Sequence, residues 1–205
     1  MLNVSQLKIA RENKVLCYEL KLSEGKILAI QGLSGVGKST LLSAIAGFID
    51  PLAGTINWNG EQLNNLPVEG RPVSYLFQDH NLFEHLTVME NLSLGFSGLA
   101  PKDELIEAAS QLNVLDQIEK LPGGLSGGQR QRIALIRTLL RPEPLVLLDE
   151  PFAELDPETR RLTVMWVKKT ANAKGKTVLM VTHQAEDAEQ LADECLVLEG
   201  TTSIP

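Results

Sequence analysis

The segment from Gly32 to Ser39 reads Gly-Leu-Ser-Gly-Val-Gly-Lys-Ser and matches the pattern G-x-x-x-x-G-K-[ST]. In such a loop, glycines let successive backbone N–H groups turn toward phosphate oxygens, and Lys38 can reach the terminal phosphates. The hydroxyl of Ser39 is suited to Mg²⁺. The apolar run 26–30 precedes the loop and a helical pattern follows it, which is the context that this chemistry requires. The pattern predicts a nucleoside triphosphate site.

Two adjacent carboxylates follow a second apolar run. The run 145–148 is of the kind expected for a strand covered on both faces in a parallel sheet, and Asp149 and Glu150 come directly after it. Ligands of α/β proteins bind at this carboxyl edge. We assign Asp149 to the Mg²⁺ shell and Glu150 to proton transfer from the attacking water, a contribution of about 10²- to 10⁴-fold in rate.

A third segment, 125–129, reads Leu-Ser-Gly-Gly-Gln and opens a helix with apolar residues at helical spacing. The free N–H groups and the positive dipole end of such a helix are available to an anion. Taken alone, this segment is only a helix N-cap with a flexible lead-in. Beside the other two segments, it predicts a second phosphate-binding end.

With these three segments, the sequence resembles the nucleotide-binding subunit of an ABC transporter over nearly its whole length. The family's Walker A, signature and Walker B elements correspond to residues 32–39, 125–129 and 145–150. Its glutamine loop corresponds to Gln78, its D-loop to 154–156, and its switch histidine to His183, all in family order.

The resemblance implies that ATP and Mg²⁺ are the cofactors and that Lys38, Gln78, Glu150 and His183 are catalytic. Gln78 would link Mg²⁺ and the attacking water to the helical part of the chain, and His183 would steady the γ-phosphate. The implied Mg²⁺ ligands are Ser39, Gln78 and Asp149. The expected nucleotide-binding residues are Gly32, Leu33, Ser34, Gly35, Val36, Gly37, Lys38, Ser39, Thr40, Gln78, Ser126, Gly127, Gly128, Gln129, Asp149, Asp156 and His183, together with Arg11, which stands where the family has an aromatic residue.

Length and composition predict one domain that positions these residues. The chain has 205 residues, 43% of them hydrophobic and 22% charged, so it can bury a core. Strand and helix patterns alternate, which predicts the α/β class. The expected fold is a P-loop NTPase core, a mainly parallel sheet with helices on both faces, plus an N-terminal antiparallel β subdomain and an inserted α-helical subdomain. The resemblance implies that residues 1–205 form a single ABC ATPase domain, with a catalytic core lobe from 1–78 and 142–205 and a helical subdomain with the signature motif from 79–141.

Several local patterns give further expectations. The strand-like runs 55–58 and 73–77 both suit an antiparallel sheet. A helix after Glu150 is expected to place Leu162, Met165 and Trp166 on one face. Cys17 and Cys195 fit neither a zinc cluster nor a disulfide framework, and we interpret them as small half-buried hydrophobic residues.

Charge and hydropathy restrict the partners. A formal net charge of −7 argues against a nucleic-acid partner, no apolar run is long enough to span a bilayer, and the N-terminus has no secretion signal. The resemblance implies a head-to-tail dimer, in which Ser126, Gly128 and Gln129 of one copy contact the γ-phosphate bound by Lys38 of the second copy. It also implies transmembrane permease subunits, an extracytoplasmic solute-binding protein met indirectly, and a peripheral position on the cytoplasmic face of the inner membrane.

The sequence departs from the family at two points. The family usually stacks an aromatic residue on adenine ahead of the Walker A strand, whereas Arg11 stands near that position; its guanidinium can stack on a base, and Tyr18 is the other candidate. We interpret Tyr18 rather as a packed sheet residue. The chain also stops at Pro205, sooner than the family's usual partner strand and closing helix imply.

The run 71–88 is similar to importer subunits, and most of all to those of bacterial thiamine importers. In this run Glu84 precedes His85, where the common importer form has proline. Leu82, Phe83 and Leu86 would help to form a groove for a short helix of the membrane subunit, or else pack within the helical insert. The leading expectation is an ATPase that drives uptake of thiamine or its phosphates. The alternatives are a soluble ABC-type switch in assembly of a protein or nucleic-acid complex, and a P-loop kinase acting on a metabolite.

Overall fold

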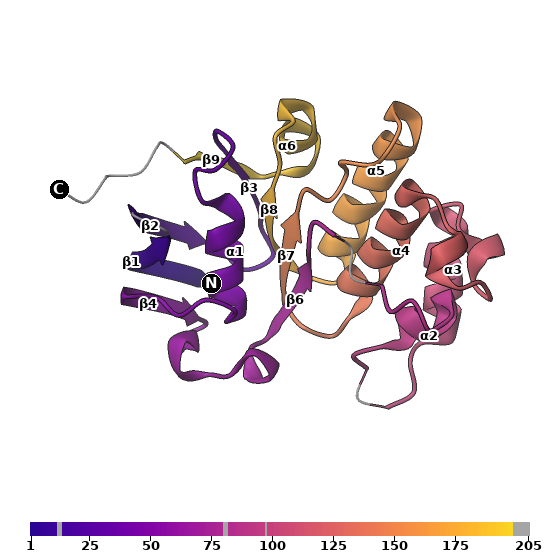
Figure 1. Ribbon diagram of the computed structural model, residues 1–205, viewed down its shortest axis with the longest axis horizontal. Helices are drawn as coiled ribbons and strands as arrows, with labels where there is room; N and C mark the ends of the chain where they lie inside the picture. Colours follow the sequence, from indigo (N-terminus) through magenta and orange to yellow (C-terminus); the bar gives the residue numbers. More distant parts are fainter. Residues whose placement is uncertain (12–13, 80–81, 97, 199–205) are drawn as a thin grey trace.

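In the computed structural model, helix α1 (Lys38–Ala46) lies between a first, antiparallel β-sheet and a second, parallel one. The other α-helices cover the side of the parallel sheet that faces away from α1 (Figure 1). The structure describes residues 1–11, 14–79, 82–96 and 98–198. Residues 199–205, where the expected closing elements would begin, lie outside them. The expected α/β fold, with a parallel sheet, an antiparallel sheet and a helical part, is confirmed.

The second sheet is parallel throughout and sets the position of the functional residues. Its strands are β3 (Ile27–Gln31), β6 (Val73–Leu76), β7 (Leu145–Asp149), β8 (Thr177–Val181) and β9 (Glu194–Val197), in the order β6-β7-β8-β3-β9. Strands β7 and β8 are buried along their whole length, as continuous apolar runs predict. Because all five strands run the same way, the segments that follow them meet at one edge.

The first sheet is antiparallel and covers the side of α1 that faces away from the parallel sheet. It contains β1 (Leu2–Arg11), β2 (Lys14–Leu22), β4 (Ala53–Trp58) and β5 (Glu61–Gln62), in the order β2-β1-β4-β5. The expectation that 55–58 belongs here is confirmed. The same expectation for 73–77 is wrong, because β6 pairs in parallel with β7. The helical crossover through residues 77–144 returns the chain to the same end of the sheet, which parallel pairing requires.

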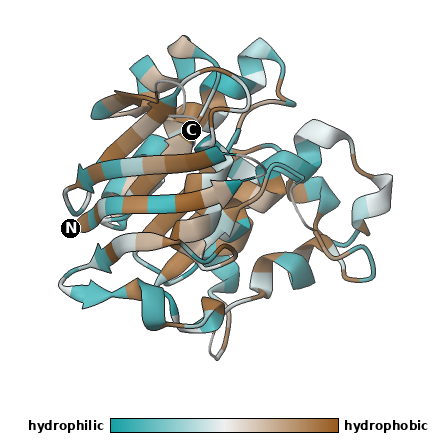
Figure 2. Ribbon diagram, turned by 60° about the vertical axis from the view of Figure 1, so that its left-hand side comes forward, coloured by the Kyte–Doolittle hydropathy of each residue, from teal (hydrophilic) through white to brown (hydrophobic). Residues whose placement is uncertain are grey.

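Alternate residues of the parallel strands face two different hydrophobic cores. In β7, Leu145 and Leu147 pack toward α1 and the antiparallel sheet, whereas Val146 and Leu148 pack toward the helical side. Figure 2 shows hydrophobic residues gathered along the strands and hydrophilic residues on the outer turns and helix surfaces. The helical part therefore shares its core with one face of the sheet that carries the site.

Within the described ranges, five α-helices cover that face: α2 (Val88–Ser93), α3 (Lys102–Gln111), α4 (Gly127–Leu140), α5 (Pro157–Ala173) and α6 (Ala185–Leu191). The apolar residues predicted from spacing in α3 and α4 are buried, which confirms the periodicity. The expectation for α5 is wrong in part. Trp166 is buried, but Met165 is 71% exposed and Leu162 is also exposed, because residues 163, 164 and 167 face the core.

Two other features concern the surface. Cys17 and Cys195 are exposed rather than half-buried, because both stand at strand positions that face outward. Among the described residues, none of the helices has the length and hydropathy needed to cross a membrane.

Candidate functional site

The phosphate loop (residues 32–39) joins β3 to α1, and the residue directly before α1 is a glycine with a left-handed backbone. Gly37 has φ +102° and is the N-cap of α1, and no side chain caps the first N–H groups of that helix. These groups and the helix dipole are therefore available to an anion. Lys38 is 5% exposed, and its Nζ donates to the carbonyl oxygens of Gly32 and Leu33 at 2.9 and 3.1 Å.

Two side chains of the antiparallel sheet support this loop. Tyr18 is buried and its hydroxyl donates to the carbonyl of Gly37 at 2.8 Å, which agrees with its interpretation as a packed sheet residue. A Cβ at Gly37 would lie 2.4 Å from that hydroxyl, so only glycine fits. Arg11 Nη1 donates to Thr40 Oγ1 at 2.6 Å, which places the guanidinium beside the first turn of α1.

Asp149 and Ser39 meet at the carboxyl edge of the sheet. Ser39 Oγ donates to Asp149 Oδ1 at 3.1 Å, and Asp149 is 4% exposed. Burial raises the pKa of the Asp149 carboxyl, against the hydrogen bond from Ser39, so a nearby cation would favour its charged form. No cluster of three or more His, Cys, Asp or Glu able to hold a metal is present in the described ranges. A hydroxyl and one carboxylate oxygen nevertheless fit Mg²⁺, which takes few protein ligands when it also binds phosphates.

Glu150 and His183 lie together beside Asp149. His183 N–H donates to Glu150 Oε2 at 3.3 Å, and its Nε2 is 3.1 Å from Glu150 Oε1, an ion-pair distance once the imidazole is protonated. Glu150 Oε1 is buried, and apart from the contact with His183 Nε2 it has no hydrogen-bonding partner among the described residues. Burial raises the pKa of the Glu150 carboxyl and lowers that of Lys38.

Gln78 lies in the turn after β6, at the same edge, and its side chain is exposed. Leu76, the last residue of β6, pairs with Leu148, directly before Asp149. The parallel sheet therefore brings Gln78 to the edge that also carries Asp149, Glu150 and His183.

The signature segment (residues 125–129) is arranged differently from the expectation of free N–H groups. Ser126 is the N-cap of α4: its Oγ accepts from Gln129 N–H at 3.3 Å, and Gln129 Oε1 accepts from Ser126 N–H at 2.9 Å. The Gln129 N–H is thus occupied, because the two side chains form a reciprocal capping box. Among the described residues, no hydrogen bond joins this segment to the phosphate loop of the same chain.

The segment 154–156 adjoins this helix end. A Cβ at Gly127 would lie 1.7 Å from Glu154 Oε2, so the Glu154 carboxylate packs directly on that glycine. Asp156 is the N-cap of α5 and accepts from the N–H groups of Glu158 and Thr159. The hydrogen bonds from Thr159 lower the pKa of the Asp156 carboxyl.

Two residues of the site are missed by the sequence interpretation. Tyr75, on β6, has its hydroxyl 3.5 Å from Asp149 Oδ2. Gln131, on α4, is fully buried and bonds to the backbone of Glu150 and Glu154. The signal for Gln131 is its spacing, since it lies on the same helix face as the buried Leu135 and Thr138.

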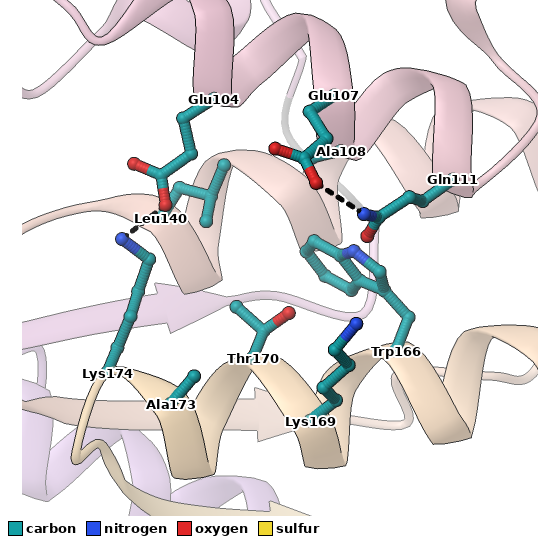
Figure 3. Close-up of a pocket in the computed structure, with 10 residues that line it drawn as sticks. All are labelled: Glu104, Glu107, Ala108, Gln111, Leu140, Trp166, Lys169, Thr170, Ala173 and Lys174. Carbon is teal, nitrogen blue, oxygen red and sulfur yellow. Dashed lines mark hydrogen bonds and ion pairs between the residues drawn. The ribbon is translucent and has the colours of Figure 1, made fainter.

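A separate hollow of about 340 Å³ lies between α3, the end of α4 and α5 (Figure 3). Trp166 forms part of its wall, and Lys174 pairs with Glu104 at 2.5 Å across its opening. Glu107 accepts from Gln111 at 2.9 Å. None of the predicted site residues lines this hollow, so the phosphate chemistry is assigned to the sheet edge.

Comparison with known proteins decides the family. The profile of the family described as ABC transporter matches residues 17–153. The chain belongs to the ABC transporter family. This ABC ATPase is 44% identical to the thiamine import ATP-binding protein ThiQ of Vibrio cholerae serotype O1, over 97% of this chain and 85% of that protein. It is 42% identical to the protein of the same name from Jannaschia sp., over 97% of this chain and 89% of the relative.

Solved structures agree with this family. The dimeric post-hydrolysis state of an ATP-binding cassette bound to ADP and Pi has a TM-score of 0.86 and 27% identity, and the match covers 97% of this chain and 94% of that chain. An ATP-binding subunit of an ABC transporter has a TM-score of 0.84 and 27% identity, over 97% of this chain and 86% of that chain. The protein is therefore an ATPase that binds ATP through an ABC fold.

Proposed function

We propose that this ABC ATPase powers thiamine uptake through separate permease subunits. The observation that carries the proposal is its similarity, over 97% of its length, to proteins named for thiamine import. The assembly-switch alternative is not favoured, since these relatives are named as import ATPases. The test is to delete the gene and to measure growth with thiamine as the limiting nutrient. Loss of growth that is restored by the parent gene supports it, and unchanged growth contradicts it.

The proposed chemistry is attack of water on the γ-phosphate of ATP. Lys38 and the N–H groups at the start of α1 hold the phosphates. Glu150 accepts a proton from the water through its buried carboxylate, while His183 orients that carboxylate and the γ-phosphate. Ser39, Asp149 and Gln78 would hold Mg²⁺, which when bound neutralises phosphate charge.

The proposed second phosphate contact comes from another copy of the chain. The signature segment makes no hydrogen bond to its own phosphate loop in the described structure, and a related cassette of known structure is dimeric. In a head-to-tail dimer, Ser126, Gly128 and Gln129 would contact the γ-phosphate held by Lys38 of the second copy, and Asp156 would lie near the interface. Closure then depends on the γ-phosphate, and hydrolysis reopens the dimer.

The pH dependence of turnover tests the role of Glu150. A general base acts only when deprotonated, and burial raises the pKa of the Glu150 carboxyl. We expect kcat to fall as the pH is lowered. The midpoint of this fall should lie at a higher pH than it would if the general base were an exposed glutamate. Profiles of kcat against pH for the parent and for Glu150→Gln measure this effect. The residual rate of the variant should not show the fall at low pH. If the variant shows the same fall at low pH, a group other than Glu150 causes it.

A groove of about 560 Å³ offers a site for a short helix of the permease. Phe48 and Phe83 are 53% and 50% exposed on its sides, and Arg137 and Arg141 also line it. Leu82 lines it as expected, but Leu86 does not. Tyr75 lines the groove as well and reaches Asp149 with its hydroxyl, so an occupant would act close to the site. The ATPase would thereby sit on the cytoplasmic face of the inner membrane, where the permease would link it to a solute-binding protein.

Replacement of Phe83 and Leu86 together by Ser tests the groove, and Phe83→Ser alone separates groove contact from the packing of Leu86, which does not line the groove. Phe83 is half-exposed, so its loss removes apolar contact area from an occupant at little cost to the folded chain. We expect loss of co-purification with the permease, with unchanged ATP affinity and melting temperature. A large fall in the melting temperature would assign these residues to internal packing instead.

Arg11 is proposed to contact the adenine base. Its guanidinium is fixed beside α1 by Thr40, and a planar guanidinium can stack on a base. We expect Arg11→Ala to weaken the binding of ATP and of GTP to different extents and to have little effect on the binding of inorganic triphosphate. Titration with the three ligands measures this, and an equal loss for all three would indicate a phosphate contact instead.

A further inference from the structure

Gln131 connects α4 to the turn that carries Glu150. Its side chain is fully buried; Nε2 donates to the Glu150 carbonyl at 3.0 Å, and Oε1 accepts from Glu154 N–H at 2.8 Å. One partner is a backbone carbonyl and the other a backbone N–H, so together they fix the positions of the nitrogen and the oxygen of the Gln131 side-chain amide. A single side chain therefore bridges both ends of the turn 150–154.

The backbone of Glu150 needs such support. Its φ is +48°, a left-handed conformation that strains a residue with a Cβ. Glu150 N–H donates to the carbonyl of Val181, at the end of β8, at 3.0 Å. The Glu150 carbonyl is held from the other side by Gln131. The direction of the carboxylate is thus set by β8 on one side and by α4 on the other.

We propose that Gln131 is a positioning residue for hydrolysis, which holds Glu150 in register with the N-terminal end of α4. This inference rests on the proposed function, because it takes Glu150 as the general base. Gln131 lies five residues beyond Ser126, the N-cap of the same helix, so α4 joins the turn that carries the base to the end that is proposed to face a partner's phosphate. Binding at that end and orientation of the base are therefore linked.

The test is Gln131→Met in the purified full chain, since methionine has a similar size and cannot bridge two backbone groups. We expect kcat to fall roughly 100-fold, the effect of misplacing a catalytic group by about 1 Å, with the affinity for a fluorescent ATP analogue unchanged. Gln131→Glu serves as a second variant if the first folds poorly. It keeps an acceptor for Glu154 N–H and sets an oxygen against the Glu150 carbonyl, so the same fall is expected.

Asn64 offers a matched control, because its amide makes the same kind of bridge elsewhere. Asn64 follows β5, and its Nδ2 donates to the Gly54 carbonyl at 3.2 Å while its Oδ1 accepts from Ile56 N–H at 2.7 Å, both on β4. Asn64→Leu should lower the melting temperature and leave kcat unchanged. If Gln131→Met behaves in the same way, its role is structural and the inference is overturned.

A double-variant cycle with Glu150→Gln gives the sharpest result. If Gln131 acts through Glu150, then Gln131→Met adds no further loss to the residual single-turnover rate of Glu150→Gln. Losses that multiply would overturn the inference. If Glu150→Gln hydrolyses ATP slowly and Gln131→Met hydrolyses it at the parent rate, only the role of Gln131 is overturned. Parent-like hydrolysis by Glu150→Gln alone overturns the base assignment and this inference with it.

Discussion

Glu150→Gln is expected to slow ATP hydrolysis by about 10²- to 10⁴-fold while ATP still binds. The amide keeps the shape of the carboxylate and still offers an oxygen to His183 N–H, but it cannot accept the proton of the attacking water. The bound ATP then persists, so the closed dimer should accumulate. Single-turnover hydrolysis and sedimentation with ATP measure the two effects.

The outcome separates two parts of the proposed mechanism. Hydrolysis by Glu150→Gln at the parent rate would remove Glu150 from the role of base. Slow hydrolysis without dimers at high protein concentration would keep the base but contradict the shared γ-phosphate. Glu194→Gln is a suitable control, since that glutamate is exposed on the edge strand β9. It should hydrolyse ATP like the parent.

Lys38→Ala is expected to weaken ATP binding by roughly 30- to several-thousand-fold, which corresponds to about 2–5 kcal/mol for truncation of one partner of a buried charge pair. Lys38 is buried beside Asp149 and Glu150, so its loss leaves the negative charge of those carboxylates facing the phosphates. It also removes the donor to the carbonyls of Gly32 and Leu33. Equilibrium titration with a fluorescent ATP analogue measures the affinity.

Lys26→Ala is the matched control for this prediction. Lys26 is half-exposed and pairs with Asp193 at 3.3 Å, away from the phosphate loop. Exposed ion pairs contribute little, so nucleotide affinity should not change. An unchanged affinity in Lys38→Ala, with a normal melting temperature, would contradict the phosphate role of Lys38.

Much of the fold could be predicted from local sequence. The buried runs of β7 and β8 and the spacing in α3 and α4 each indicate their element without knowledge of the rest of the chain. The direction of β6 could not be predicted, because its apolar run suits either kind of pairing and only the crossover to β7 decides it. The outward position of Met165 was missed for a similar reason, since an apolar spacing does not show which helix face meets the sheet.

The candidate site divides in the same way. Glycine spacing, a lysine, and acids at the end of a buried strand are local signals, because a phosphate cradle and a strand end are each made by a few consecutive residues. The bridge from Gln131 to Glu150 and the hydroxyl of Tyr75 beside Asp149 join elements far apart in the chain. The sequence alone determined which residues carry charge and where strands end. Only tertiary packing decided which buried polar groups meet, because each buried donor or acceptor must find a partner and that partner depends on the arrangement of whole elements.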